Sequence, residues 1–236
     1  KPCGSFKTPT HAGAGGSGIY GGTGGAALKI EASTLVVDGT ISVNGQNAYT
    51  SESSGYYGGG GAGGSLWFDV TDFSGIGLIS ANGGRGSGFN DNFGGSGSGG
   101  RIAIHSNANT FVGDVQAFSM SMQTSMYSGS AGTIYYETGT NITRRYRTLS
   151  IDSNNVVSQH ATQLSDPDVE RYQVDKLLVH RSARLGINKV GYFSTLTSTI
   201  LQGDGSGHLQ FIAGTKLVVV GGTNVTELAP DLDKWV

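Results

Sequence analysis

Short stretches of alternating apolar and polar residues recur along this chain, and glycine-rich stretches separate them. The clearest copy spans residues 64–70 (GSLWFDV) and is followed by residues 77–84 (GLISANGG). Alternation with a period of two predicts a half-buried strand, and Gly and Asn at its ends predict turns. Each unit therefore reads as a strand, a turn, a second short strand and a glycine-rich stretch.

The copies keep constant offsets. Ser65 follows Ala27 at an offset of 38 (65 − 27), and Ile79 follows Ile41 at the same offset (79 − 41). The next copy keeps an offset of 36 in both halves, at Arg101 (101 − 65) and at position 115 (115 − 79), and a fourth strand at 133–136 follows 101–104 at an offset of 32. Repetition at such a period indicates units that stack on one another.

Stacking predicts the fold class. A single unit cannot bury its apolar side, so each strand is expected to pair with its equivalent in the next unit. Two columns of inward side chains are predicted: Leu28, Leu66, Ile102 and Ile134 in one, and Ile41, Ile79 and Val115 in the other. The expected fold is all-β, a parallel β-helix or solenoid with glycine-rich corners, and the alternative is a β-sandwich or jelly roll. Glycine at the corners would allow close backbone approach and left-handed dihedral angles.

Glycine becomes scarce after about residue 140. This change divides the chain into a glycine-rich β-repeat region, residues 1–140, and residues 141–236, which are either a continuation of the β-helix or a second small all-β domain. A further internal match at an offset of 32 aligns Leu177, Val179, Ala183 and Leu185 with Leu209, Phe211, Thr215 and Leu217. No window carries the apolar stripe of a helix. The strand at 217–220 has no evident polar cap, which predicts an open end.

Composition excludes several classes. Glycine makes up 41 of 236 residues, and its clusters lack the uniform period of collagen. A charged fraction of 14% and a net charge of −2 argue against a nucleic-acid partner. No apolar run is long enough to span a membrane. The only cysteine, Cys3, is a candidate for an intermolecular or external disulfide, and Asn141 and Asn224 begin glycosylation sequons. These features favour a secreted or cell-surface glycoprotein.

The repeats resemble a known kind of protein segment. The motifs GGSLWFDV (63–70), GLISANGG (77–84) and GGRIAI (99–104) are similar to glycine-rich β-repeat regions of large secreted or cell-surface, adhesin-like proteins. The resemblance covers about residues 20–140. It implies an extracellular structural or adhesive part of a longer chain, and it implies no catalytic residue.

Candidate chemistry is sparse. Asp69 and Asp72 lie beside Trp67, and Asp91 lies near Arg85 and Arg101, which are residue types that polysaccharide-active β-helices use. Two weak candidates for calcium ligation are the acidic stretch with Asp166, Asp168 and Glu170, and Asp204. The basic cluster is Arg144, Arg145 and Arg147, for which a solvated face or an ion pair with a neighbouring acidic loop is expected, and contact with an acidic glycan or partner is the alternative. No histidine has a metal-ligand spacing. We therefore predict no catalytic residue and no cofactor.

Three functions are compatible with this sequence. The first is a non-enzymatic extracellular structural or adhesive rod segment that self-associates into a fibre or binds other segments of its parent chain. The second is a polysaccharide lyase or hydrolase. The third is a module that binds carbohydrate or ice, for which the threonine-rich residues 195–199 are the only hint of a ladder. Glycans are the expected partners in the second case and in carbohydrate binding.

Overall fold

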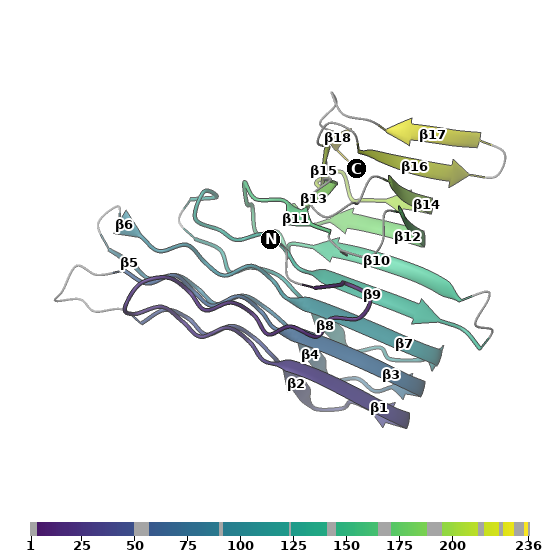
Figure 1. The fold of residues 1–236 in the computed structure, drawn as a ribbon, viewed down its shortest axis with the longest axis horizontal. Helices are drawn as coiled ribbons and strands as arrows, with labels where there is room; N and C mark the ends of the chain where they lie inside the picture. The colour runs from purple at the N-terminus through teal and green to yellow at the C-terminus, as the bar shows by residue number, and fades with distance from the viewer. Residues whose placement is uncertain are drawn as a thin grey trace.

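The computed structural model describes residues 4–49, 57–89, 92–122, 124–140, 145–164, 171–187, 195–211, 215–221, 224–228 and 234–235. Within these ranges the predicted all-β class is confirmed: there is no helix, and a large, mostly parallel sheet of nine strands runs through the protein (Figure 1). In spatial order the large sheet contains β1 (Ala27–Val36), β3 (Ser65–Ser74), β7 (Arg101–Asn109), β9 (Thr133–Thr138), β10 (Tyr146–Asp152), β12 (Arg171–His180), β14 (Thr195–Gln202), β16 (Lys216–Gly221) and β17 (Asn224–Leu228).

Smaller sheets carry the returning chain. One has three strands, β2 (Thr40–Ser42), β4 (Leu78–Ser80) and β8 (Asp114–Gln116). Another has four strands, β11 (Thr162–Gln163), β13 (Arg184–Ile187), β15 (His208–Phe211) and β18 (Lys234–Trp235). The pair β5 (Gly88–Phe89) and β6 (Asn92–Phe93) forms a separate hairpin.

The predicted register of the first units is confirmed. Parallel pairing places Ala27 beside Ser65, Ser65 beside Arg101, and Arg101 beside Thr133. Both predicted columns exist, because Leu28, Leu66, Ile102 and Ile134 are successive partners, as are Ile41, Ile79 and Val115. The central members are fully buried, with Leu66 and Ile79 both at 0% exposure. Stacking of equivalent strands therefore builds this part of the core.

The predicted match at an offset of 32 in the second half is wrong. Leu177 pairs with Leu201, and Leu185 pairs with Leu209, so the true offset is 24 (201 − 177 and 209 − 185). The neighbouring offsets are 28, from Leu149 to Leu177, and 21, from Leu196 to Leu217. The units shorten because the connection from a return strand to the next long strand falls from 20 residues (81–100) to 7 (188–194). The alternating apolar pattern fits several registers equally well, so alternation alone did not identify the right offset.

Strand direction reverses once in the middle of the large sheet. The strands β9 and β10 are antiparallel (Figure 1), whereas β1, β3, β7 and β9 pair in parallel, as do β10, β12, β14 and β16. The sheet nevertheless keeps growing in the same direction, from β1 towards β17. The sequence did not predict this antiparallel pair or the final pair, β16 and β17.

The hydrophobic core changes to the opposite face of the sheet at the same place. Ile134 belongs to the core beneath β4, whereas its neighbour Tyr135 points to the other face and joins the core beneath β13. Connections between parallel strands are right-handed in nearly all proteins. When strand direction reverses and the sheet grows onward, a connection of unchanged hand has to cross the opposite face. The reversal at β9–β10 therefore explains why the second half packs its return strands on the other side.

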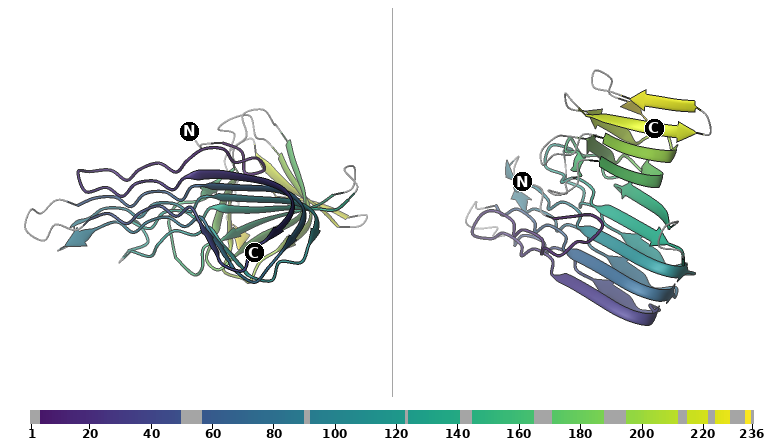
Figure 2. Two further views of the ribbon diagram at one scale, coloured as in Figure 1. Left: turned by 90° about the horizontal axis from the view of Figure 1, so that it is seen from below. Right: turned by 45° about the vertical axis from the view of Figure 1, so that its right-hand side comes forward.

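The glycine-rich stretches are extended segments that run side by side away from the sheet, not corners (Figure 2). Residues 58–64 show their arrangement, since successive amides donate to three different neighbours. Gly59 and Ala62 donate to Ser17 and Ala14, Gly60 and Gly63 donate to Gly95 and Ser98, and Gly61 and Gly64 donate to Gln46 and Val43. A strand directs its amides two ways, whereas a polyproline II helix, with about three residues per turn, directs them three ways. We call this bundle the glycine arm.

Close packing of backbones explains the glycine content of the arm. A Cβ atom added to Gly61 would overlap the carbonyl group of Thr23, and one added to Gly97 would overlap the carbonyl group of Gly61. Close approach is thus confirmed as the role of these glycines. The expectation of left-handed dihedral angles is wrong for most of the arm, because Gly18 is its only described glycine with a positive φ.

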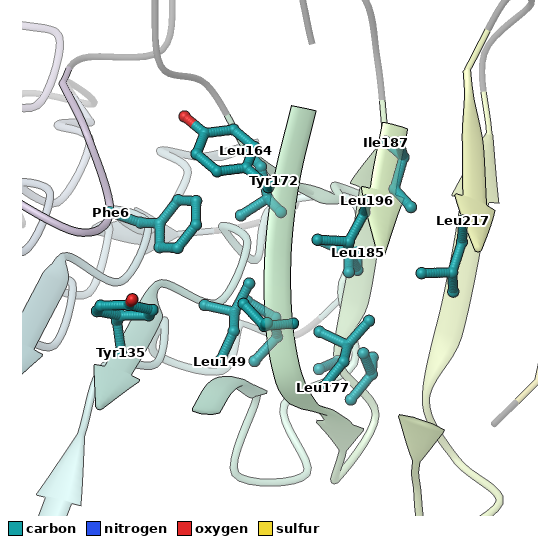
Figure 3. Packing of buried hydrophobic residues seen from close by; sticks show 14 of the residues in the cluster. Phe6, Tyr135, Leu149, Leu164, Tyr172, Leu177, Leu185, Ile187, Leu196 and Leu217 are labelled. Carbon is teal, nitrogen blue, oxygen red and sulfur yellow. The ribbon is translucent and has the colours of Figure 1, made fainter. Parts of the chain in front are cut away.

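The N-terminal segment runs back across the molecule. Residues 11–17 lie antiparallel on the glycine arm, and Phe6 is buried between Tyr135 and Tyr172, with ring centroids 5.4 and 4.8 Å away (Figure 3). Phe6 thereby joins the core of the second half next to the point where strand direction reverses. The N-terminal segment therefore covers the face of the large sheet that carries Tyr135 at that position.

The predicted open end at 217–220 is also wrong. The strand β16 is paired along its length with β17, from Leu217 opposite Leu228 to Gly221 opposite Asn224. A sequence pattern could not show that the chain folds back there to cover its own edge. Among the described strands, the two edges of the large sheet are therefore β17, with five residues, and β1, with ten.

Candidate functional site

A row of ionisable side chains crosses the first four strands of the large sheet. Glu31, Asp69, His105 and Glu137 are successive register partners on β1, β3, β7 and β9. They point away from the core beneath β4, because their neighbours Phe68 and Ile104 are buried in it. We call these four residues the polar row.

Trp67 lies next to the polar row, on the same face as Asp69, as alternation predicts. The Lys29 ammonium group sits 4.0 Å from the centroid of the Trp67 ring, and the Lys29 Nζ also lies 2.5 Å from Glu31 Oε1. The Trp67 ring additionally contacts His105 edge-on, at 6.0 Å. A sugar ring would need the indole face that Lys29 covers, so this arrangement gives little support to carbohydrate stacking on Trp67.

Glu137 is the best-connected member of the row. It accepts a hydrogen bond of 2.8 Å from the Tyr135 hydroxyl, and its carboxylate lies 3.9 Å from Arg145 and 4.0 Å from Arg147. The backbone amide of Arg147 donates to Asp175 Oδ2 over 2.7 Å. Of the two outcomes expected for the basic cluster, the ion pair is present for Arg145 and Arg147, with a carboxylate on the strand β9 and not in an acidic loop.

Burial sets the protonation of two members of this site. Desolvation lowers the pKa of His105 below its usual 6.5, although Glu137 and Asp69 act in the opposite direction. Desolvation also raises the pKa of Tyr135, and the negative charge of Glu137 adds to this effect. His105 is therefore neutral near pH 7, and Tyr135 remains a hydroxyl donor. The hydrogen bond between the Tyr135 hydroxyl and Glu137 therefore holds the two side chains together, with Tyr135 as the donor.

A second polar group lines a cavity of about 360 Å³ on the opposite face, just beyond β8. Asp152 and Arg181 form an ion pair there, with Arg181 Nε 2.7 Å from Asp152 Oδ1. Ser150 Oγ lies 3.1 Å from His180 Nε2, and Asp152 Oδ2 lies 3.6 Å from the same nitrogen. A serine nucleophile would need the carboxylate on the other imidazole nitrogen. This cluster therefore does not match a catalytic triad and acts as an ion-paired support of adjacent turns.

The remaining predicted site residues are not brought together. Asp72 is exposed outside the polar row, and the amide of Arg85 donates to Asn47 Oδ1 over 2.7 Å. Arg101 begins β7 beside the glycine arm. Asp204 caps a turn by accepting hydrogen bonds from the Ser206 hydroxyl and from the amides of Arg181 and Ser206, and these bonds lower its pKa.

Several predictions fall outside what the structure describes. These are Cys3, Asn141, Asp91, Arg144 and the acidic stretch with Asp166, Asp168 and Glu170. Asn224 is the first residue of β17, and only its backbone is described. Across the described ranges, no three or more His, Cys, Asp or Glu side chains gather as a metal site.

The threonine-rich stretch does not extend into a ladder among the described strands. Thr195 lies between Arg171 and Lys216, and Thr197 lies between Gln173 and Val218. Ice-binding surfaces of the kind considered above would need threonine at equivalent positions on neighbouring strands. The hint given by residues 195–199 is therefore not supported.

Sequence reasoning missed the polar row, although its signal was present. The offsets of 38, 36 and 32 carry Glu31 onto Asp69, Asp69 onto His105, and His105 onto Glu137. Applying the offsets to polar positions as well as apolar ones would have found it. The cavity at Asp152 and His180 had no such signal, because it depends on the reversal at β9–β10.

No protein-family model, curated protein or solved structure matches this chain. Within the described ranges, no helix is long and apolar enough to cross a membrane.

Proposed function

We propose that this chain is a non-enzymatic structural or adhesive part of an extracellular protein, built from solenoid-like stacked coils that self-associate through an exposed end. The proposal rests on the exposure of β1. This strand has the same alternation of apolar and polar residues as the buried strand β3, yet no other described strand covers its outer side. Leu28 is 41% exposed, whereas its partner Leu66 is 0% exposed.

The rest of the first coil is uncovered in the same way. Most residues of β1 are exposed, whereas in β3 buried residues alternate with more exposed ones. Ile41 on β2 is half-buried, and its partner Ile79 is fully buried. A long uncovered edge strand with apolar residues is a template for pairing with another chain, and natural proteins usually block such an edge unless it is used.

The chain itself does not cover this edge in the described region. Upstream of β1, residues 11–26 run out and back along the glycine arm, and Phe6 packs against Tyr135 of β9, away from the edge at β1. The partner is therefore expected to be another polypeptide, and a second copy suits the charges of the edge. If two β1 strands pair antiparallel around Ile30, Lys29 of each lies opposite Glu31 of the other, which is favourable across a sheet.

Light scattering tests the proposal by measuring molecular mass against protein concentration. Self-association is expected for the parent chain. The variant Leu28→Lys should weaken it at least about tenfold, since it places a charge on the apolar edge.

The matched control is Val157→Lys, which adds the same charge at a residue that is 58% exposed in the second half of the chain, after β10. This variant should associate like the parent, and both variants should melt as single folded species. A parent chain that stays monomeric at millimolar concentration would refute the proposal, and so would association that Leu28→Lys leaves unchanged.

A further inference from the structure

The glycine arm holds the N-terminal segment through a repeated pair of backbone groups. The segment at residues 11–17 lies in the groove between residues 22–25 and 58–64. Within that groove, the Gly25 carbonyl accepts from the Gly13 amide over 2.8 Å, and the Ala62 amide donates to the Ala14 carbonyl over 2.8 Å. One carbonyl and one amide, from neighbouring segments of the arm, thus bind an antiparallel polyproline II segment.

The same pair recurs in the next groove without a partner. By the offsets of the sheet, Gly63 is equivalent to Gly25 (63 − 25 = 38) and Ser98 is equivalent to Ala62 (98 − 62 = 36). Among the described residues, neither the Gly63 carbonyl nor the Ser98 amide has a hydrogen-bond partner. Gly63 and Ser98 both line a cavity of about 450 Å³ beside the N-terminal segment. A backbone-lined groove therefore continues past the segment that fills its first position.

A second group on the cavity wall is also unsatisfied. The side-chain oxygen Oε1 of Gln163, which lines the same cavity, is buried and has no hydrogen-bond partner among the described atoms. Buried polar groups are nearly always hydrogen-bonded in folded proteins. The unpaired backbone groups of Gly63 and Ser98 therefore indicate a missing polar occupant, and the Gln163 side chain is a further polar group in the same wall.

The geometry points to an occupant of defined chemistry: we infer that this groove binds an extended, glycine-rich segment of another polypeptide chain, with glycine at every third position. The first groove sets this rule, because a Cβ atom on Gly13 would overlap the Ala62 carbonyl, and one on Gly16 would overlap the Gly59 carbonyl. A segment lying on equivalent carbonyls faces the same restriction. A polyproline II segment also presents an amide or carbonyl to the groove at every third residue, matching Gly63 and Ser98.

The groove lies on the glycine arm, so its occupancy does not depend on the proposed pairing at β1. The probe is a fluorescent synthetic peptide with the sequence of residues 11–19, and binding to the full chain is measured by anisotropy. Saturable binding is expected. A control peptide carrying Gly13→Ala and Gly16→Ala should not bind, since its methyl groups meet the carbonyl wall.

Ser98→Pro is the decisive protein variant. Proline removes the unused Ser98 amide and places its ring in the groove, whereas its φ suits the polyproline II backbone and no existing hydrogen bond of the amide is lost. Peptide affinity should fall at least about tenfold, which is the effect of roughly one strong hydrogen bond. Gly15→Pro is the matched control, because Gly15 is exposed outside the cavity, and it should change affinity less than about twofold.

An NMR measurement on the unmodified chain covers the case in which Ser98→Pro fails to fold. Saturating peptide should slow hydrogen exchange of the Ser98 amide and shift its resonance. The inference is overturned if the parent binds no peptide at millimolar concentration. It is equally overturned if Ser98→Pro binds as tightly as the parent, or if the Ser98 amide does not respond, because the peptide would then occupy another place, such as the groove of residues 11–17.

Discussion

The two halves of the large sheet pack their return strands on opposite faces. From β1 to β9 equivalent strands recur at offsets of 38, 36 and 32, and the return strands β2, β4 and β8 lie on one face. From β10 to β16 they recur at offsets of 28, 24 and 21, and β11, β13 and β15 lie on the other face. A single hairpin separates the two arrangements.

The shorter units of the second half show that the glycine arm is an addition to the stacked strands. The long units contain a strand, a short return strand and two polyproline II segments, which occupy the 20 residues (81–100) between β4 and β7, whereas the short units keep the strands and have only 7 residues (188–194) between β13 and β14. The turn between a long strand and its return strand is kept, at Gly75 in the first half and at Arg181 and Ser182 in the second, all with positive φ. Because the strands persist when the arm disappears, the strands determine the stacking and the arm extends the surface.

Breaking the core of the first half should have the strongest effect. Ile79→Asp places a carboxylate at a fully buried position in the column of Ile41 and Val115. Burial of an unpaired charge should cost at least about 4 kcal/mol and abolish the cooperative unfolding transition. Chemical denaturation followed by circular dichroism measures this loss. Ile19→Asp, at a residue that is 83% exposed, should unfold like the parent; equal stability of the two variants would contradict the stacked core.

The next effect concerns whether the arm is packed as tightly as the sheet. Gly61→Ala would bring a methyl group onto the Thr23 carbonyl, so the backbone has to move, at a cost of about 3 kcal/mol. Gly39→Ala is the matched control, because an added Cβ atom there meets no atom within 4 Å, and its effect should stay within about 0.5 kcal/mol. Thermal melts of both variants measure the difference, and equal melting temperatures would mean that the arm is loose.

A smaller effect concerns pH and the polar row. The pKa of His105 is lowered in the folded state, so the unfolded chain binds more protons as pH falls below about 6.5. Its contribution to stability is therefore full above that pH and declines below it. The denaturation midpoint of the parent should fall between pH 7.5 and pH 5.5, and His105→Gln should reduce this fall. An unchanged slope in His105→Gln would show that His105 titrates normally.

The weakest effect belongs to the turns of the second half. Ser182 has a φ of 66°, which is unfavourable for a residue with a side chain and permitted for glycine. Its amide donates to Ser206 Oγ, and a glycine retains that amide. Ser182→Gly should therefore stabilise the chain by about 0.5–1 kcal/mol in denaturant titration. A loss of stability would show that the turn is not strained.

The periodicity of the sequence predicted the strand pairing of the first half of the fold and did not predict that of the second half. The offsets of Ala27, Ser65 and Arg101 were sufficient to fix which strands pair and which face is buried. The reversal at β10 and the cover of β16 by β17 depend on where the chain turns back, which alternating patterns do not encode. The match of Leu177 to Leu209 failed for the same reason, since many registers satisfy alternation.

The candidate site was predictable in part. Trp67 and Asp69 were placed on one face by alternation, whereas charge suggested an ion pair for Arg145 and Arg147 without identifying Glu137 as the partner. The unpaired groups in the groove at Gly63 and Ser98 could not be predicted. Their importance depends on three-way hydrogen bonding in the arm, and clustered glycine in a sequence equally suits a flexible linker.

A packed glycine arm with a period of three, joined to stacked strands, is the feature on which the rest depends. Residue-resolved hydrogen exchange of amides 95–100 by NMR is its sharpest test. Slow exchange is expected at Ser96, Gly97, Gly99 and Gly100, whose amides are hydrogen-bonded, and fast exchange at Gly95 and Ser98, whose amides have no partner among the described residues. Fast exchange at all six amides, or protection that alternates with a period of two, would contradict a packed arm of this kind.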